Sequence, residues 1–317
     1  MTKLPPDNPL LSVLQQRISS SHLRLRLGIE ADHEAQIFGQ GRNTFHIENW
    51  YSLHSVIRNT LRLLRLHQRG KRNALNIQIS HNDIVIDRLP EPFDGYTILQ
   101  ISDLHLDANP QMPQALIERL RRVDYDLCVL TGDFRAKTHG SFEPALAGMQ
   151  VIRHHLKDPV YGVLGNHDSI LMVPDMEEMG IRLLLNESAV LRREEAEVYL
   201  VGIDDPHYYR ADNIEKAVLN LPEASPSILL SHSPEIYRHA AHTGFDVMLC
   251  GHTHGGQICL PGGIPLMCNA RCPRDLCSGP WKYHNMTGYT SRGSGVSVVD
   301  VRFNCPAEIT LHHLRKA

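Results

Sequence analysis

The chain has 317 residues, of which 42% are hydrophobic, and this is enough for a full core in one large α/β domain or in a domain with an appendage. Lysine and arginine number 32 against 35 aspartates and glutamates, so the net charge of −3 excludes a general electrostatic attraction to long nucleic acid. The first eight residues lack the form of a signal peptide, and no run of about 18 apolar residues occurs. We therefore expect a cytoplasmic protein, in which the seven cysteines stay reduced and disulfides are not expected.

The first 45 residues predict one short helix and one strand. Residues 10–18 have the spacing of a helix. Beyond them, apolar side chains alternate with polar ones, which is typical of a half-buried strand with Arg24 and Arg26 on its wet face. The alternating apolar residues are Leu23, Leu25, Leu27 and Ile29. We expect no chemistry from this region.

From Trp50 to Arg69 the pattern changes to a helical period, with the apolar residues on one face. A basic stripe lies beside that face and consists of Arg58, Arg62, Arg65 and Arg69. One interpretation is a helix that lies in the interface of an anionic membrane, which makes the protein peripheral on the inner membrane. The alternative is a helix that packs on its own domain and leaves the arginines in solvent.

Two short apolar segments, 75–79 and 84–86, flank His81-Asn82-Asp83 and predict a hairpin. Pro90 and Pro92 then close the amino-terminal region. We therefore divide the chain into an α+β appendage at 1–92 and a larger α/β domain at 93–317.

Strand-like and helix-like segments alternate in the larger domain, as in a layered α/β fold. Strands are predicted at 96–101, 127–130, 160–164, 228–230 and 247–249, and helices at 112–123 and 145–156. Each strand is followed by metal-ligand residue types. In chain order these are Asp103, His105, Asp133, Asn166, His167, Asp168, His232, His252 and His254. Open α/β sheets bind ligands at the carboxyl ends of their strands, so we expect these side chains at one edge.

Any one of these histidines alone would more often be a core or surface residue. Their joint occurrence at five strand ends predicts a metal site. The glycines before Asp133, Asn166 and His252 support it, because a residue without Cβ lets the loop turn sharply toward an ion. Carboxylate, amide and imidazole ligands without thiolate favour Mn²⁺, with Fe or Zn²⁺ as alternatives.

These motifs resemble those of the calcineurin-like metallophosphoesterases, which carry Asp-x-His, Gly-Asp, Gly-Asn-His-Asp/Glu, a lone His and Gly-His-x-His in this order. The resemblance covers the chain from about residue 94 and implies a four-layer α/β/β/α sandwich with two divalent metal ions. It implies that one ion is held by Asp103, His105 and His254, the second by Asn166, His232 and His252, and that Asp133 bridges them. By the same resemblance, His167 protonates the leaving group and Asp168 orients its ring. A histidine beside a carboxylate can stay cationic near neutral pH, which suits that role.

Differences between this sequence and other branches of the family reduce the range of expected substrates. The sequence after Gly132-Asp133 lacks the Asp-Arg pair of protein Ser/Thr phosphatases, which disfavours a protein substrate. The segments 255–263, 291–293 and 302–306 are similar to a bacterial branch of membrane-associated phosphodiesterases, some of which cleave UDP-2,3-diacylglucosamine in lipid A synthesis. A soluble nucleotide or another small phosphodiester is the alternative substrate. A non-catalytic metal-binding scaffold is disfavoured because every ligand of the motifs is present.

Cys259, Cys268, Cys272 and Cys277 lie outside these motifs. Their spacing is looser than in zinc sites, so we interpret the segment as a loop over the site, where Arg271, Arg274 and Trp281 could meet a headgroup or acyl chain. Asp204-Asp205-Pro206-His207 predicts a turn near the site without a catalytic role for His207.

Overall fold

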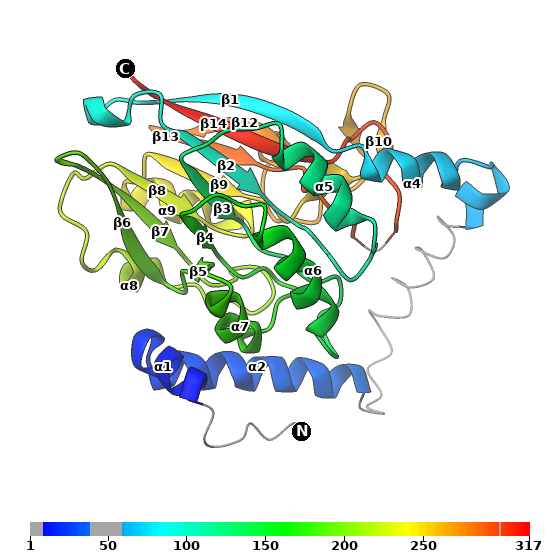
Figure 1. The fold of residues 1–317 in the computed structure, drawn as a ribbon, viewed down its shortest axis with the longest axis horizontal. Coiled ribbons are helices and arrows are strands. Elements are labelled where there is room, and N and C mark those ends of the chain that lie inside the picture. Colours follow the sequence, from blue (N-terminus) through cyan, green and yellow to red (C-terminus); the bar gives the residue numbers. More distant parts are fainter. Residues whose placement is uncertain (1–8, 39–58, 298) are drawn as a thin grey trace.

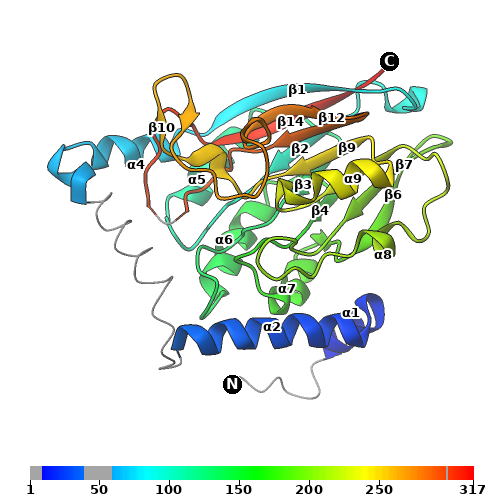
Figure 2. The ribbon, with the colours of Figure 1, turned by 180° about the vertical axis from the view of Figure 1, so that it is seen from behind.

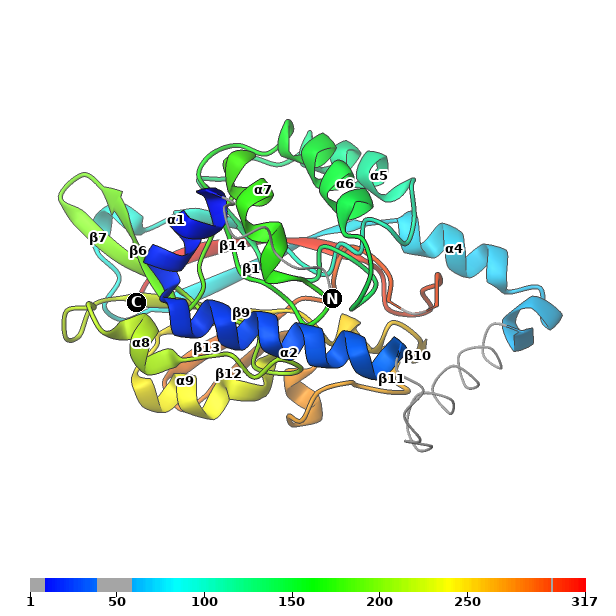
Figure 3. The same ribbon diagram turned by 90° about the horizontal axis from the view of Figure 1, so that it is seen from below.

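Two six-stranded sheets pack face to face in the computed structural model, which describes residues 9–38, 59–297 and 299–317 (Figure 1). Helices cover the outer faces of both sheets (Figures 1 and 3). The predicted four-layer α/β/β/α arrangement is confirmed.

The first sheet joins strands from both ends of the chain. Its strands, in spatial order, are β1 (Gln78–Ile86), β14 (Glu308–Lys316), β2 (Thr97–Ile101), β3 (Leu127–Leu130), β4 (Val160–Gly162) and β5 (Arg182–Leu183). All neighbours are parallel except β14 and β2, which are antiparallel. The predicted strands at 96–101, 127–130 and 160–164 are thus β2, β3 and β4.

The second sheet contains the remaining two predicted strands, β8 and β9, at its centre. Its spatial order is β12 (Gly279–Tyr283), β13 (Met286–Thr290), β9 (Val247–Cys250), β8 (Ser227–Leu230), β7 (Ala196–Gly202) and β6 (Glu187–Arg193). The four strands from β13 to β7 are parallel, and the outer pairs are antiparallel hairpins. Five parallel strand ends therefore point toward one edge of the sandwich.

Strand β3 shows how the layers form. Leu127 and Val129 pack between the two sheets, while Cys128 and Leu130 face the helical layer on the other side. Because both faces are covered, all four residues are buried and the strand reads as a continuous apolar run. The outer layer on this side consists of α5 (Met112–Leu120), α6 (Glu143–Arg153) and α7 (Val173–Glu178), and α8 (Ile214–Val218) and α9 (Tyr237–Thr243) cover the second sheet.

The amino-terminal segment is helical where we predicted a strand. Helix α1 (Pro9–Ile18) agrees with the prediction, but α2 (Ser20–Phe38) replaces the strand at 23–29 (Figure 2). Leu23 and Arg26 are buried three residues apart, whereas Leu25 is exposed, so burial follows a helical period. The prediction that Arg26 faces water is therefore wrong.

The predicted hairpin at 75–86 is one continuous strand, β1. His81, Asn82 and Asp83 do not form its turn; they pair in parallel with Leu311, His312 and His313 of β14. Pairing with a strand more than two hundred residues away overrides the local turn preference of Asn and Asp. β1, which lies in the predicted appendage at 1–92, is an edge strand of the first sheet. The boundary at residue 92 stays a prediction.

The predicted basic helix from Trp50 to Arg69 lies partly outside the described residues, which resume at 59. Residues 59–63 are helical, the chain turns at Arg65 with φ 57°, and α4 (His67–Leu75) begins as a new helix. A single helix through Arg69 is therefore wrong. Gly70 lets α4 approach the chain near Val301, where an added Cβ would lie 2.6 Å from the Val301 Cβ. Across the described ranges, no helix combines the length and apolar character needed to span a bilayer.

Candidate metal centre

The structure brings the predicted ligands together at the carboxyl ends of β2, β3, β4, β8 and β9. Their donor atoms form three groups, each within 4.8 Å: Asp103, His105 and His254; His105, Asp133 and His167; and Asp133, His232 and His252. Asp133 belongs to two groups, which is the position expected of a bridging carboxylate. Asn166 joins the third group, because its Oδ1 lies 2.9 Å from His232 Nε2 and 2.8 Å from His252 Nδ1.

The backbone turns sharply where the strands end. Several ligand residues have left-handed φ values, which cost non-glycine residues on the order of 1 kcal/mol each. These are Asp103 (52°), His105 (43°), Asp133 (56°), His252 (72°) and His254 (51°). The turns aim short polar side chains inward from the sheet edge, and the strain is offset by the contacts they make there.

The tautomers of two histidines show that a cation fits among these donors. His232 Nδ1 donates to the Thr131 carbonyl at 2.7 Å, and His252 Nε2 donates to the Asn269 carbonyl at 2.6 Å. In the neutral rings, the other nitrogens are therefore lone pairs, and both point at the Asn166 oxygen. Asp133 Oδ2 lies 3.3 Å from His232 Nε2, so with His232 neutral the acceptor atoms converge without a donor between them. A divalent ion matches this donor set.

The pKa values of the histidines in this site also favour a bound cation. Burial lowers the pKa of His105 to about 4 and lowers the pKa values of His252 and His254 far below the usual value, which keeps these rings neutral, as metal ligands must be. Burial also disfavours the charged form of His232, but the Asp133 carboxylate beside it raises the pKa of His232 to about 10. A proton on His232 Nε2 would thus occupy the place of a cation beside Asp133, and a bound metal ion would displace that proton.

His167 lies beside the ligand groups and partly open to solvent, with 18% of its side chain exposed. Its Nδ1 donates to the Ala136 carbonyl at 2.6 Å, and its Nε2 is 3.9 Å from Asp133 Oδ2. The free edge of the ring therefore faces the centre from the solvent side. This is the position that a proton donor to a leaving group requires.

Asp168 has a different place from the one predicted. Its carboxylate is buried and accepts hydrogen bonds from the backbone N–H groups of Asp133, Phe134, Arg135 and Gly165. The His167 ring is oriented instead by the Ala136 carbonyl. Asp168 thus fixes the loops that carry Asp133 and Asn166. The predicted contact between its carboxylate and the His167 ring is not present.

Helix α2 supports the loop after β4, at residues 168–170, and we did not predict this contact from sequence. Arg26 is fully buried and donates to Asp204 Oδ1 at 3.2 Å and to the Asp168 carbonyl at 3.0 Å. Glu30, one turn later, accepts from Ser169 Oγ at 2.6 Å and from the Ile170 N–H at 2.8 Å. The signal that could have revealed this is the helical spacing of the buried residues, which the alternating leucines concealed.

A second unpredicted support is Arg302, which is also fully buried. Its guanidinium donates to the carbonyls of Arg292 and Gly295, both at 2.7 Å, and contacts His254 Nδ1 at 3.2 Å. Arg302 thereby holds the loop at residues 292–295, which packs closely against Asp103. A Cβ on Gly293 would lie 2.8 Å from the Asp103 Cβ. Arg302 therefore ties the carboxyl-terminal segment to two predicted ligands.

The predicted turn at 204–207 is present: Asp205 accepts from the N–H groups of His207, Tyr208 and Tyr209. The His207 ring lies 4.2 Å from that of His252 and bonds Glu235 at 3.1 Å. It therefore forms part of the rim beside the ligands.

The cysteine-rich loop differs from expectation in two ways. Cys268 and Cys277 form a disulfide, whereas the compartment predicted reduced thiols; the fold of the loop, which composition does not encode, brings them together. Trp281 is buried in the second sheet and donates to Thr290 Oγ1, so the prediction that it could meet a headgroup or acyl chain is wrong. The loop does border the site, because Asn269 accepts from the ligand His252.

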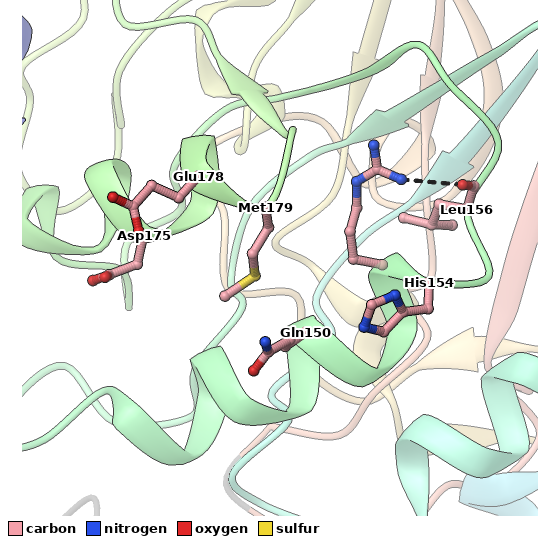
Figure 4. A pocket seen from close by; sticks show the side chains of 7 residues that line it. Gln150, His154, Leu156, Asp175, Glu178 and Met179 are labelled. Carbon is pink, nitrogen blue, oxygen red and sulfur yellow. Dashed lines mark hydrogen bonds between the residues drawn. The ribbon is translucent and has the colours of Figure 1, made fainter.

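A separate cavity of about 680 Å³ lies between α6 and α7 (Figure 4). It is lined by Gln150, Arg153, His154, Leu156, Asp175, Glu178 and Met179. None of the predicted ligands lines it, so this cavity is not the metal centre.

Two mixed sheets with Asp, Asn and His gathered at their strand ends define a metal-dependent phosphoesterase. The family model of the calcineurin-like phosphoesterases matches residues 96–256. The uncharacterized metallophosphoesterase YkoQ of Bacillus subtilis (strain 168) is 32% identical over 78% of this chain and 93% of its own length. The chain therefore belongs to the calcineurin-like phosphoesterase family, and it is a hydrolase of the metallophosphoesterase class.

Two further relatives have described activities. Phosphodiesterase YaeI of Escherichia coli (strain K12) is 27% identical over 69% of this chain and 82% of its own. UDP-2,3-diacylglucosamine pyrophosphatase LpxG of Chlamydia muridarum (strain MoPn / Nigg) is 27% identical over 71% of this chain and 86% of its own.

Proposed function

We propose that the protein hydrolyses a phosphodiester or pyrophosphate bond with two divalent metal ions. One ion would be held by Asp103, His105 and His254, the other by Asn166, His232 and His252, with Asp133 shared. The observation that carries this proposal is the convergence of acceptor atoms around Asn166 Oδ1, together with the presence of Asp133 in two donor groups. Mn²⁺ is the preferred ion, and Fe or Zn²⁺ also suit oxygen and imidazole donors.

Two divalent ions, when bound, would lower the pKa of a water molecule and neutralise charge on the phosphoryl oxygens. The chain supplies the rest. Asp168 and the backbone amides around it keep the loops of Asp133 and Asn166 in place. His167, held through Nδ1, carries a proton on Nε2 toward the leaving oxygen as the ester or anhydride bond breaks.

The substrate we propose is a lipid-linked nucleotide such as UDP-2,3-diacylglucosamine, met on the cytoplasmic side of a membrane. The similarity to LpxG supports this choice. A soluble nucleotide or other small diester is the alternative, supported by the similarity to the phosphodiesterase YaeI. A non-catalytic scaffold is least supported, because every ligand of the motifs is present in the assembled site.

The test is hydrolysis of UDP-2,3-diacylglucosamine beside bis-p-nitrophenyl phosphate, after chelator treatment and addition of Mn²⁺. We expect UMP release by the wild type and none by Asp133→Ala. Cleavage of the chromogenic diester alone would keep the chemistry and reject the lipid substrate. Loss of both activities in the Mn²⁺-loaded wild type would reject the proposed function.

A further inference from the structure

Exposed apolar side chains are concentrated in two segments of the molecule. Among the described residues, eleven large hydrophobic side chains are exposed, and six of them lie at 63–64 and 260–267. They are Leu63, Leu64, Leu260, Ile264, Leu266 and Met267. Isolated exposed leucines are ordinary, but a group of this kind indicates an interaction surface.

The second of these segments is a hairpin that projects from the body of the protein. Strands β10 (Cys259–Leu260) and β11 (Ile264–Pro265) pair in antiparallel register, and the turn between them contains Gly262 and Gly263, both with positive φ. Leu260 and Ile264, a register pair next to this turn, are 49% and 54% exposed. The tip of the hairpin is therefore apolar and open, without a single charged residue from 259 to 268.

The hairpin and the segment before α4 lie at one end of the molecule, as all three ribbon views show (Figures 1, 2 and 3). Residues 302 and 303 lie between the two segments and are hydrogen-bonded to both. The Cys259 N–H donates to the Phe303 carbonyl at 2.9 Å, and the Arg302 N–H donates to the Gly70 carbonyl at 3.1 Å. The two apolar groups thus belong to one continuous structure, which we call the basic apolar end: residues 59–72 and 259–267.

The charge of this end is uniform in sign. Residues 59–76 include five lysines and arginines and no acidic residue, although the whole chain has a net charge of −3. Lys71 pairs with Asp300, whereas Arg62, Arg65, Arg69 and Arg72 are exposed, and within the described part of the chain none of these four has an acidic partner in ion-pair range. Cations that flank exposed apolar side chains match the headgroups and acyl boundary of an anionic bilayer.

The basic apolar end also adjoins the metal centre. The hairpin begins five residues after His254, and just beyond its far side the Asn269 carbonyl accepts from His252. A surface that anchored the hairpin tip would therefore hold two predicted ligands close to it.

We infer that the basic apolar end docks on an anionic lipid bilayer, with the side chains at the hairpin tip inserted and the arginines on the headgroups. Docking would place the metal centre beside lipid headgroups, and this consequence rests on the proposed function. The binding itself does not depend on catalysis. The hairpin makes this surface different from the amphipathic helix predicted from sequence, because most of its exposed apolar side chains come from residues 260–267.

The experiment is flotation of the full chain with vesicles of phosphatidylcholine and phosphatidylglycerol, with vesicles of phosphatidylcholine alone for comparison. The hairpin variant is Ile264→Asp with Leu266→Asp, and the charge variant is Arg62→Glu with Arg65→Glu. The matched control is Val151→Asp with Leu219→Asp, which are 51% and 78% exposed on other surfaces.

We expect the wild type and the control to float with anionic vesicles. The hairpin variant should lose at least about tenfold in partitioning, because two apolar insertions are removed. The charge variant should lose about fivefold for each arginine, and the loss should shrink at high salt. Circular dichroism and thermal unfolding establish that each variant is folded.

Flotation of the folded hairpin variant equal to that of the wild type would overturn the inference, as would a wild type that stays in solution. Hydrolysis of bis-p-nitrophenyl phosphate by the wild type without vesicles is measured separately. Failure of that hydrolysis contradicts the proposed function, whereas failure of flotation contradicts the docking surface.

Discussion

At the scale of single residues, His167 and the metal ligands have separable tasks. His167 is bound through Nδ1 to a carbonyl and contributes its own ring to none of the contacts between Asn166 and the other ligands. Removing its ring should therefore leave the strand-end geometry in place.

We expect His167→Ala to keep its affinity for Mn²⁺ and to lose roughly 10²- to 10⁴-fold in kcat on diesters with poor leaving groups, because the proton donor is gone. The loss should be much smaller for p-nitrophenyl esters, whose leaving group needs no proton. Isothermal titration with Mn²⁺ and a series of leaving groups measure this. Full turnover of the Mn²⁺-loaded variant on an alkyl diester would contradict the role of His167.

Asp204 gives the protein a specific sensitivity to acid. Burial disfavours its charged form, but the Arg26 guanidinium beside it lowers the pKa of Asp204 to about 2, below the usual 3.8. Because the folded-state pKa lies below the unfolded one, this carboxylate stabilises the fold above about pH 4. The contribution, on the order of 2 kcal/mol, is lost as the pH falls from about 4 toward about 2.

Urea unfolding at about pH 5 and about pH 3 tests this dependence. The free energy of unfolding of the wild type should fall more steeply than that of Asp204→Asn, which has no carboxylate to titrate at this position. Equal slopes would show that the Asp204 pair does not contribute.

At the scale of elements, α2 is a structural part of the phosphoesterase body. Its buried face reaches the loop after β4 through Arg26 and Glu30. Arg26 also lies over the Tyr209 ring, with 3.3 Å between Cζ and the ring centroid. The helix thereby connects the β4 loop to the turn at 204–209.

Arg26→Met should lower the free energy of unfolding by about 3–5 kcal/mol, because buried Asp204 loses its guanidinium partner and keeps only His22 as a side-chain partner. Turnover and Mn²⁺ affinity should fall with it, since the Asp168 carbonyl loses its donor. Arg24→Met is the matched control on the exposed side of the same helix and should stay within about 0.5 kcal/mol of the wild type. Denaturant titrations of both variants decide this; a similar loss in both would contradict a specific role for Arg26.

The elements that sequence predicted well are those whose environment is uniform along their length. β3 is buried on both faces, so its apolar run is unambiguous, and the ligand after it lies where a parallel strand must end. The alternating leucines of α2 are compatible with a strand and also with a helix that buries Leu23 and Arg26. Only the tertiary contacts decide between these two structures. β1 carries a local turn signal that its pairing with β14 overrides. The hydrogen bonds of Asp168 depend on loops distant in sequence, so no motif could place them.

At the scale of the whole molecule, ligands from both sheets meet across one edge. Asp103, Asp133 and Asn166 follow strands of the first sheet, while His232 and His252 follow strands of the second. Ions bound there would connect the two sheets. Binding to the folded state alone raises stability by mass action.

Mn²⁺ at about 100 times its Kd should therefore raise the free energy of unfolding by about 2.7 kcal/mol per site. A chelator should lower the midpoint of thermal unfolding, and added Mn²⁺ should restore it. Asp133→Ala should respond much less to either treatment. A midpoint of the wild type that is insensitive to chelator would contradict the proposed metal centre.

The position of β14 has a consequence for the synthesis of the protein. β14 lies between β1 and β2, so the chain made last separates two strands that are made first. A ribosome that has translated the chain through Arg292 has produced every predicted ligand, yet β1 still lacks its neighbour and Arg292 lacks its buried partner Glu308. The first sheet therefore closes only after β14 has emerged. Until then the nascent chain exposes unpaired strand edges, which can pair wrongly with other chains.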